Sequence, residues 1–145
     1  MKRPHHRGER VRKPYEKEIR ELHAFFEAWY RGTIDDSDGS FSRVENALAP
    51  GFTLITSGGQ IIARNQLLAL LRAEYATKPD IEMWVENVQL RLEAGDIVLV
   101  NYEEHGTTAN GKQSTLITAV LRKNPEQQNG MEWVHIHEVR LPSQS

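Results

Sequence analysis

The chain of 145 residues contains no cysteine, and this absence removes several kinds of chemistry at once. Disulfides, thiolate-bound metals, iron–sulfur clusters and a cysteine nucleophile are all excluded. No apolar run approaches the ~18–20 residues that span a membrane, so we expect no membrane partner. What remains, with 39% hydrophobic and 26% charged residues, is typical of one globular domain.

Positive charge is unevenly spread along a chain whose formal net charge is −2. Residues 1–14 carry six Lys or Arg and one acid, whereas residues 15–145 carry twelve Lys or Arg and nineteen acids. The first segment has too few apolar residues to fold, so we predict a disordered basic arm over 1–14, a solvated tail rather than a nucleic-acid contact. It lacks the apolar core of a secretory signal. We expect a cytoplasmic protein with one domain over 15–142 and a tail over 143–145.

The first half of the chain has helical spacing of its apolar residues. This spacing predicts an amphipathic helix over 16–31, ended by Gly32. Shorter helical patterns follow over 41–49 and 65–77, and a hairpin with a Gly-Gly turn is predicted between them over 51–63.

The second half alternates apolar and polar residues, which predicts four strands, over 81–93, 97–106, 113–123 and 131–142. The alternation shifts by one residue near Glu86 and Asn87, which indicates a β-bulge that bends the strand. Short connections favour antiparallel pairing. Because the helices precede the strands without βαβ units, the class is α+β. We expect a cone-shaped barrel, in which a highly curved, mostly antiparallel sheet wraps around three N-terminal helices.

Three segments, taken in order, resemble the nuclear-transport-factor-2-like superfamily, in its SnoaL-like and kinase-association-domain-like branch. They are the aromatic-rich first helix, ALAPGFTLITSGGQIIARNQLLALL, and the ending TAVLRK with EWVHIHEVRLP. The resemblance covers roughly residues 16–142 and implies a conical cavity. It implies little about function, because the fold hosts isomerases, cyclases, dehydratases, epoxide hydrolases and dimerisation modules. The first hairpin strand holds no acid, where the ketosteroid-isomerase branch has its catalytic carboxylate.

The last strand carries two histidines, His135 and His137. Regular alternation would place them ~7 Å apart on one face, together with Trp133. A neutral histidine can donate or accept a hydrogen bond in an apolar cavity, so we expect one of them to anchor a ligand. The alternative is a metal, with further ligands from Glu103, Glu104 and His105. The glutamate and glycine spacing of cupin-type sites is missing, so we expect no metal and no cofactor.

The segment Tyr102 to His105 is the second polar cluster. Tyr102 and Glu104 share one face, so a cavity on that side would give Glu104 the role of general base beside a phenol donor. The alternative is a set of exposed charges at a strand end. Aromatic residues supply core first, but some can line a cavity. The expected ligand-binding residues are Trp29, Tyr30, Phe52, Tyr102, Trp133, His135 and His137, and the catalytic candidates are Glu104 and His137.

Three functions stay open on this sequence. The first is binding of a small, largely apolar molecule in the conical cavity. The second is acid–base catalysis by a cyclase, isomerase or dehydratase that uses Glu104 or His137. The third is a non-catalytic association module. The strand segments 97–102 and 116–121 are apolar on both faces, and the chain's own helices can cover only one, so we expect a homodimer through the outer sheet face.

Overall fold

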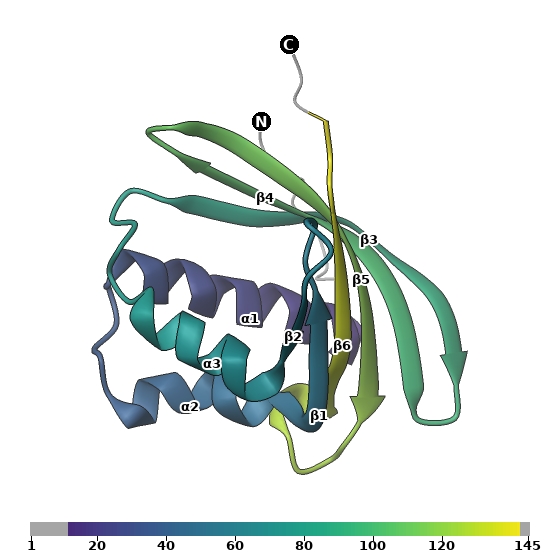
Figure 1. The fold of residues 1–145 in the computed structure, drawn as a ribbon. Coiled ribbons are helices and arrows are strands. Elements are labelled where there is room, and N and C mark those ends of the chain that lie inside the picture. Colours follow the sequence, from purple (N-terminus) through teal and green to yellow (C-terminus); the bar gives the residue numbers. More distant parts are fainter. Residues whose placement is uncertain (1–11, 143–145) are drawn as a thin grey trace, which may run out of the picture.

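The computed structural model describes residues 12–142, with three helices against one face of a six-stranded sheet (Figure 1). The helices are α1 (Pro14–Arg31), α2 (Asp38–Ala47) and α3 (Arg64–Ala73). The strands are β1 (Leu48–Ile55), β2 (Ile61–Ala63), β3 (Glu82–Ala94), β4 (Ile97–Thr108), β5 (Gly111–Lys123) and β6 (Met131–Arg140). A 3-10 turn, η1 (Gln128–Gly130), leads into β6. No helix in the described range is both long and apolar enough to cross a membrane.

The predicted α+β cone is confirmed, but the sheet is curled rather than closed into a barrel. Its strand order is β2-β1-β6-β5-β4-β3, so β2 and β3 remain edges. All neighbouring strands are antiparallel except β1 and β6, which are parallel. The β4–β5 hairpin bends over α1, which gives the sheet its cone shape (Figure 1). Most of the predicted arm, residues 1–11, and the predicted tail, 143–145, lie outside the described residues, and α1 begins at Pro14.

Helix α1 buries one apolar stripe, as its spacing predicts. Ile19, Leu22, Phe25 and Trp29 are buried in the core of the cone. The helix ends at Gly32, whose φ of 75° is in the left-handed region. A Cβ at this position would also lie 2.7 Å from Cβ of Ala76. Both the dihedral angle and this close approach therefore require glycine at position 32.

The other two helices differ from their predicted bounds for local reasons. Helix α2 starts earlier because the Ser37 hydroxyl accepts a hydrogen bond from the backbone N–H of Ser40 at 3.0 Å. It ends at Ala47 because Leu48 is extended and pairs with β6. Helix α3 begins at Arg64, one residue before its predicted start. The side chain of Gln66 accepts from the backbone N–H of Ala63, the residue that precedes the helix.

Cross-strand pairing defines the two faces of the sheet, because paired residues point to the same side. The inner face, toward the helices, is buried and apolar along the middle of the cone. Its core members on β4 and β5 are Val98, Val100, Tyr102, Ile117, Ala119 and Leu121. The intervening positions point to the outer face, which none of the helices within residues 12–142 covers (Figure 1).

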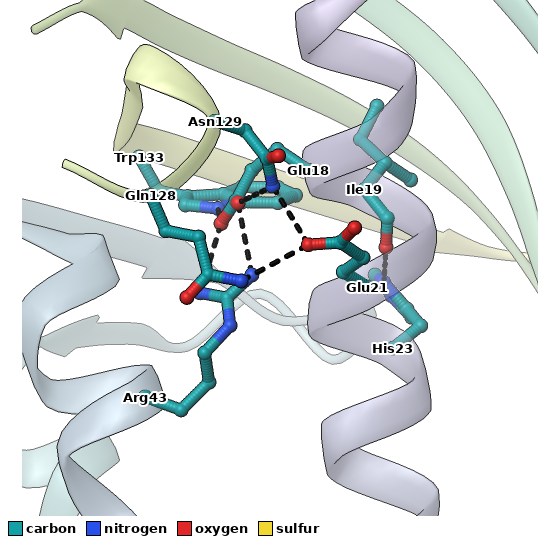
Figure 2. Close-up of polar contacts among 8 residues, drawn as sticks. All are labelled: Glu18, Ile19, Glu21, His23, Arg43, Gln128, Asn129 and Trp133. Atoms are coloured by element: carbon teal, nitrogen blue, oxygen red, sulfur yellow. Dashed lines mark hydrogen bonds and ion pairs between the residues drawn. The ribbon is translucent and has the colours of Figure 1, made fainter. Parts of the chain in front are cut away.

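A buried carboxylate joins the helices to the start of β6 (Figure 2). Glu18 on α1 is 0% exposed. Its oxygens accept two hydrogen bonds from the guanidinium of Arg43, at 2.9 and 3.2 Å, and one each from Asn129 and the indole of Trp133, at 2.9 Å. Every acceptor direction of the buried charge is thus used by a donor, and this cluster holds together α1, α2, η1 and β6.

Candidate ligand chamber

A hollow of about 1260 Å³ opens beside the β4–β5 hairpin. Four of its lining side chains come from the inner face of three adjacent strands. Glu104 on β4 pairs with Thr115 on β5, Thr115 pairs with Arg140 on β6, and Glu138 lies two residues before Arg140. The segment between α3 and β3 supplies Lys78 and Ile81, and β3 supplies Met83. This hollow, the chamber, is therefore lined by charges of both signs with a smaller apolar part.

An ion pair joins α1 to Glu104, a chamber residue on β4. Nε2 of His23 lies 3.0 Å from a carboxylate oxygen of Glu104. The other ring nitrogen, Nδ1, donates to the backbone carbonyl of Ile19 at 2.9 Å (Figure 2). A carbonyl only accepts, so Nδ1 carries hydrogen and the imidazole is fixed in one orientation. Burial works to raise the pKa of Glu104, but the hydrogen bond and positive charge of His23 outweigh it and lower this pKa overall.

Beside this pair lies a hydroxyl without a partner. Tyr102 is 1% exposed, and its hydroxyl is buried with no hydrogen-bond partner among the described residues. Its ring meets the ring of His23 edge to face, with centroids 5.3 Å apart. Burial and the nearby carboxylate of Glu104 raise the pKa of Tyr102 and likewise that of Tyr30. Both phenols therefore keep their protons and are available as donors.

The second carboxylate of the chamber behaves differently from the first. Burial raises the pKa of Glu138, and the negative charge of Glu104 raises it further, against the smaller opposite effects of Arg140 and His23. Glu104 is thus held ionised, while Glu138 is driven toward its protonated form. Two carboxyls whose pKa values are pushed apart can serve as a base and an acid, or as an acceptor and a donor for a bound hydroxyl.

We expect Glu138→Gln to stabilise the protein at neutral pH. The raised pKa means that the protonated form of Glu138 fits the fold better. The stability that Glu138 adds to the fold is therefore complete below its pKa in the unfolded chain, near the ordinary 4.5. This stability is lost as pH rises through the pKa of Glu138 in the folded chain. The amide imitates the protonated acid, so the free energy of unfolding should rise at pH ~7 by less than about 1 kcal/mol, given partial burial. Urea unfolding at pH ~7 and pH ~4 checks this, since the gain should vanish at the lower pH.

The two histidines of β6 lie away from the chamber, on the outer face. His135 pairs with Val120 and His137 with Thr118, both outer positions of β5. The hydroxyl of Thr53 hydrogen-bonds Nδ1 of His135 at 2.8 Å, and His137 is exposed. Regular alternation from Trp133 would have placed all three on one face. A bulge at Val134 breaks it: Trp133 pairs with Leu121 on the inner face, and the strand then changes phase. A ligand anchored inside the cone by His135 or His137 does not fit this register.

The remaining predicted residues divide between core and chamber. Trp29, Phe52 and Trp133 are at most 1% exposed and belong to the core, so they do not line the hollow. Glu104 lies in the chamber, with Tyr102 buried beside it. The predicted set omits the chamber residues Lys78, Thr115, Glu138 and Arg140, and also His23, which pairs with the chamber residue Glu104. One signal was available: His23 lies beside the apolar stripe of α1, where a buried histidine needs a partner.

Comparison with known proteins gives this domain a family. The model of the sucrose-6-phosphate phosphohydrolase C-terminal family matches residues 15–142. The chain belongs to this family. Two curated relatives from Nicotiana tabacum, sucrose-phosphatase 1 and sucrose-phosphatase 2, are 26% and 24% identical to this chain over 127 residues. The match covers 86% of the chain, which spans only about 30% of the length of those relatives.

Solved structures show the fold of this family member. An NTF2-like protein of unknown function from Pseudomonas aeruginosa superposes with a TM-score of 0.80 at 23% identity, covering 89% of this chain and 99% of that one. A CaMKII hub from S. rosetta gives a TM-score of 0.65 at 11% identity, over 92% and 99% of the two chains. A CaMKII hub homology domain from Chlamydomonas gives 0.67 at 16%, over 89% and 97%. The NTF2-like superfamily and its kinase-association-like branch, which the resemblance implied, are confirmed at the level of fold.

Proposed function

We propose that the protein binds a small hydroxyl-bearing molecule, of the sugar or sugar phosphate class, in the chamber. The observation that carries this proposal is the buried hydroxyl of Tyr102, which has no partner and lies beside the ion pair of His23 and Glu104. An unsatisfied buried polar group costs about 1–3 kcal/mol. A ligand hydroxyl, or a water that bridges the phenol and the ligand, would supply the missing partner.

The lining of the chamber favours a polar ligand over the largely apolar one expected from the sequence. Glu104, Glu138 and Thr115 offer acceptors and donors suited to hydroxyl groups, while Lys78 and Arg140 can pair with a phosphate. The lining also has an apolar part, to which Ile81, Met83 and Leu141 contribute. The family name and the names of the tobacco relatives refer to sucrose and its phosphate, which supports the same ligand class.

The proposal is tested by isothermal titration calorimetry of the full chain with sucrose and with sucrose 6-phosphate. We expect binding of at least one of them, and an affinity lower by about tenfold or more in Glu104→Gln, since hydrogen bonds to charged groups are worth about 1.5–3 kcal/mol. His137→Gln, an exposed histidine on the outer face, is the matched control and should bind like the wild type. Absence of binding to both sugars, or equal affinity in Glu104→Gln, would contradict the proposal.

Self-association through the outer face is a second candidate function, because apolar side chains lie exposed there. Leu116 and Val139 pair across β5 and β6 on the outer face and are 37% and 48% exposed. Adjacent exposed apolar residues on an uncovered sheet favour a second copy of the chain. The CaMKII hub domains among the structural neighbours have the same fold, which supports this candidate.

Leu116→Lys combined with Val139→Lys should convert a dimer into a monomer while the fold is kept. Two charges placed at the centre of an apolar contact lose their hydration and repel their symmetry-related copies. Light scattering at micromolar concentration gives the mass, and circular dichroism checks the fold. Leu90→Lys is the control and should leave the mass unchanged, because Leu90 is an exposed apolar residue on the inner side of edge strand β3. A wild-type chain that is already a monomer would exclude this second candidate.

A further inference from the structure

Three side chains of metal-ligand type converge on the outer face, where β3 and β4 pair. Glu86, Glu103 and His105 each present one ligand atom, and these atoms lie within 4.8 Å of one another. Glu86 pairs directly with Glu103, and His105 follows two residues later on the same face of β4. Nε2 of His105 lies 3.0 Å from Oε1 of Glu103 and 3.5 Å from Oε1 of Glu86.

The imidazole of His105 is the part that distinguishes this cluster from a group of exposed acids. Its side chain is only 8% exposed. Nδ1 lies 2.7 Å from the hydroxyl oxygen of Ser114, and the ring stacks on Trp84 with centroids 5.4 Å apart. Nε2 donates to Oε1 of Glu103 at 3.0 Å, because a carboxylate only accepts. A cation that binds between the three side chains would displace this hydrogen, and Nδ1 would then donate to Ser114 while Nε2 served as a ligand.

The two carboxylates are oriented by residues outside the set. The side-chain amide of Asn87 donates to Oε2 of Glu103 at 2.9 Å, and the indole N–H of Trp84 donates to Oε2 of Glu86 at 3.0 Å. Each acid thus has one oxygen held by a donor while its other oxygen faces His105. Donors that fix the far side of each ligand are the usual outer shell of a metal site. The β3 bulge after Glu86, where Asn87 has a φ of 55°, forms this arrangement.

From this geometry we propose that Glu86, Glu103 and His105 bind one zinc ion on the outer face of the sheet. Two ligand atoms at ~2.0–2.1 Å from a tetrahedral zinc lie ~3.3 Å apart. The separations of 3.0 and 3.5 Å from Nε2 to the two acids bracket that value. One imidazole and two carboxylates with a water as fourth ligand is a donor set that zinc accepts. Glu103 and His105 also line the hollow, but from the opposite face of β4 to Glu104. The zinc proposal uses none of the residues to which sugar binding is assigned, so it does not depend on that proposal.

Zinc titration of the full chain by calorimetry, in metal-free buffer, tests the site. His5 and His6 are replaced by glutamine in every sample, because these N-terminal histidines are also possible metal ligands. We expect one zinc per chain, with the affinity lowered by at least about 10–100-fold in Glu103→Gln and in Glu86→Gln. Glu86 is half-exposed, so its amide variant should fold normally. His137→Gln, on the same face, is the control and should bind like the parent.

A second readout tests the ligands themselves rather than a loss of fold. Cobalt(II) in place of zinc should give visible absorption bands that shift or vanish in His105→Gln and Glu103→Gln, while Asn87→Ala weakens cobalt binding through lost orientation of Glu103. Circular dichroism confirms the fold of each variant. The proposal is overturned if the parent protein binds no zinc at millimolar metal, or if folded Glu86→Gln and Glu103→Gln variants bind it with unchanged affinity.

Discussion

Glu18→Ala should lower the free energy of unfolding by about 3–5 kcal/mol, the usual cost of removing one partner from a buried ion pair. The substitution leaves the guanidinium of Arg43, whose side chain is 16% exposed, without its counter-charge. It also leaves the buried indole N–H of Trp133 without an acceptor, and the amide of Asn129 keeps only its hydrogen bond to Glu21 (Figure 2). Chemical unfolding followed by circular dichroism measures the loss.

Two further variants test whether the loss of stability comes from the broken buried ion pair or from the removal of any acidic side chain near η1. Glu21→Ala removes a neighbouring acid that contacts the same η1 turn from a more exposed position, and it should cost less than about 1 kcal/mol. Adding Arg43→Met to Glu18→Ala should recover part of the stability, because the unpaired charge is then absent. If Glu18→Ala costs no more than Glu21→Ala, the buried cluster does not hold the helices to β6 as described.

Trp29→Phe should lower the free energy of unfolding by about 2–4 kcal/mol through lost volume and a lost hydrogen bond. Trp29 is 0% exposed, with its ring centroid 4.7 Å from that of Tyr75 and 5.1 Å from that of Phe41. Its indole N–H donates to the backbone carbonyl of Leu71 at 2.7 Å. Phenylalanine removes this donor, so the carbonyl of Leu71, near the end of α3, keeps only the backbone N–H of Glu74 as a partner.

The same variant distinguishes the core from the ligand wall in which the sequence had placed Trp29. If Trp29 is only core, sugar affinity measured by calorimetry below the melting temperature should remain as in the wild type. Trp84→Phe, a partly exposed tryptophan on the outer face, is the stability control and should cost less than about 1 kcal/mol. A Trp29→Phe protein of normal stability, or one that folds but loses sugar binding, would contradict the placement of this residue.

Most of the fold could be predicted because its information is local and periodic. The stripe of α1 and the alternation of β3, β4 and β5 are set by burial of one face, so the elements and their order follow from residue spacing. The bulge in β3 was predictable as well, because the apolar set visibly changes phase near Glu86. The bulge at Val134 was not, since Trp133 and His135 are each compatible with either face of a strand. That single extra residue reversed the expected direction of both histidines.

The chamber could be predicted only in part because its residues meet through tertiary structure. Glu104 was identified from its place beside Tyr102 on one strand. Its partner His23 comes from α1, and no spacing in the sequence relates a helix position to a strand position so far along the chain. Glu138 was missed for the same reason as the histidines, because its face depends on the bulge at Val134.

The central claim, a polar ligand chamber on the inner face, is tested most directly by nuclear magnetic resonance. In a titration of the isotope-labelled full chain with sucrose 6-phosphate, backbone amide signals of Glu104, Thr115 and Glu138 should shift in a saturable way. The signals of Thr118 and His137, on the opposite face of the same strands, should stay in place. Shifts confined to the outer-face residues, or no saturable shift at any residue of the chamber, would contradict the account.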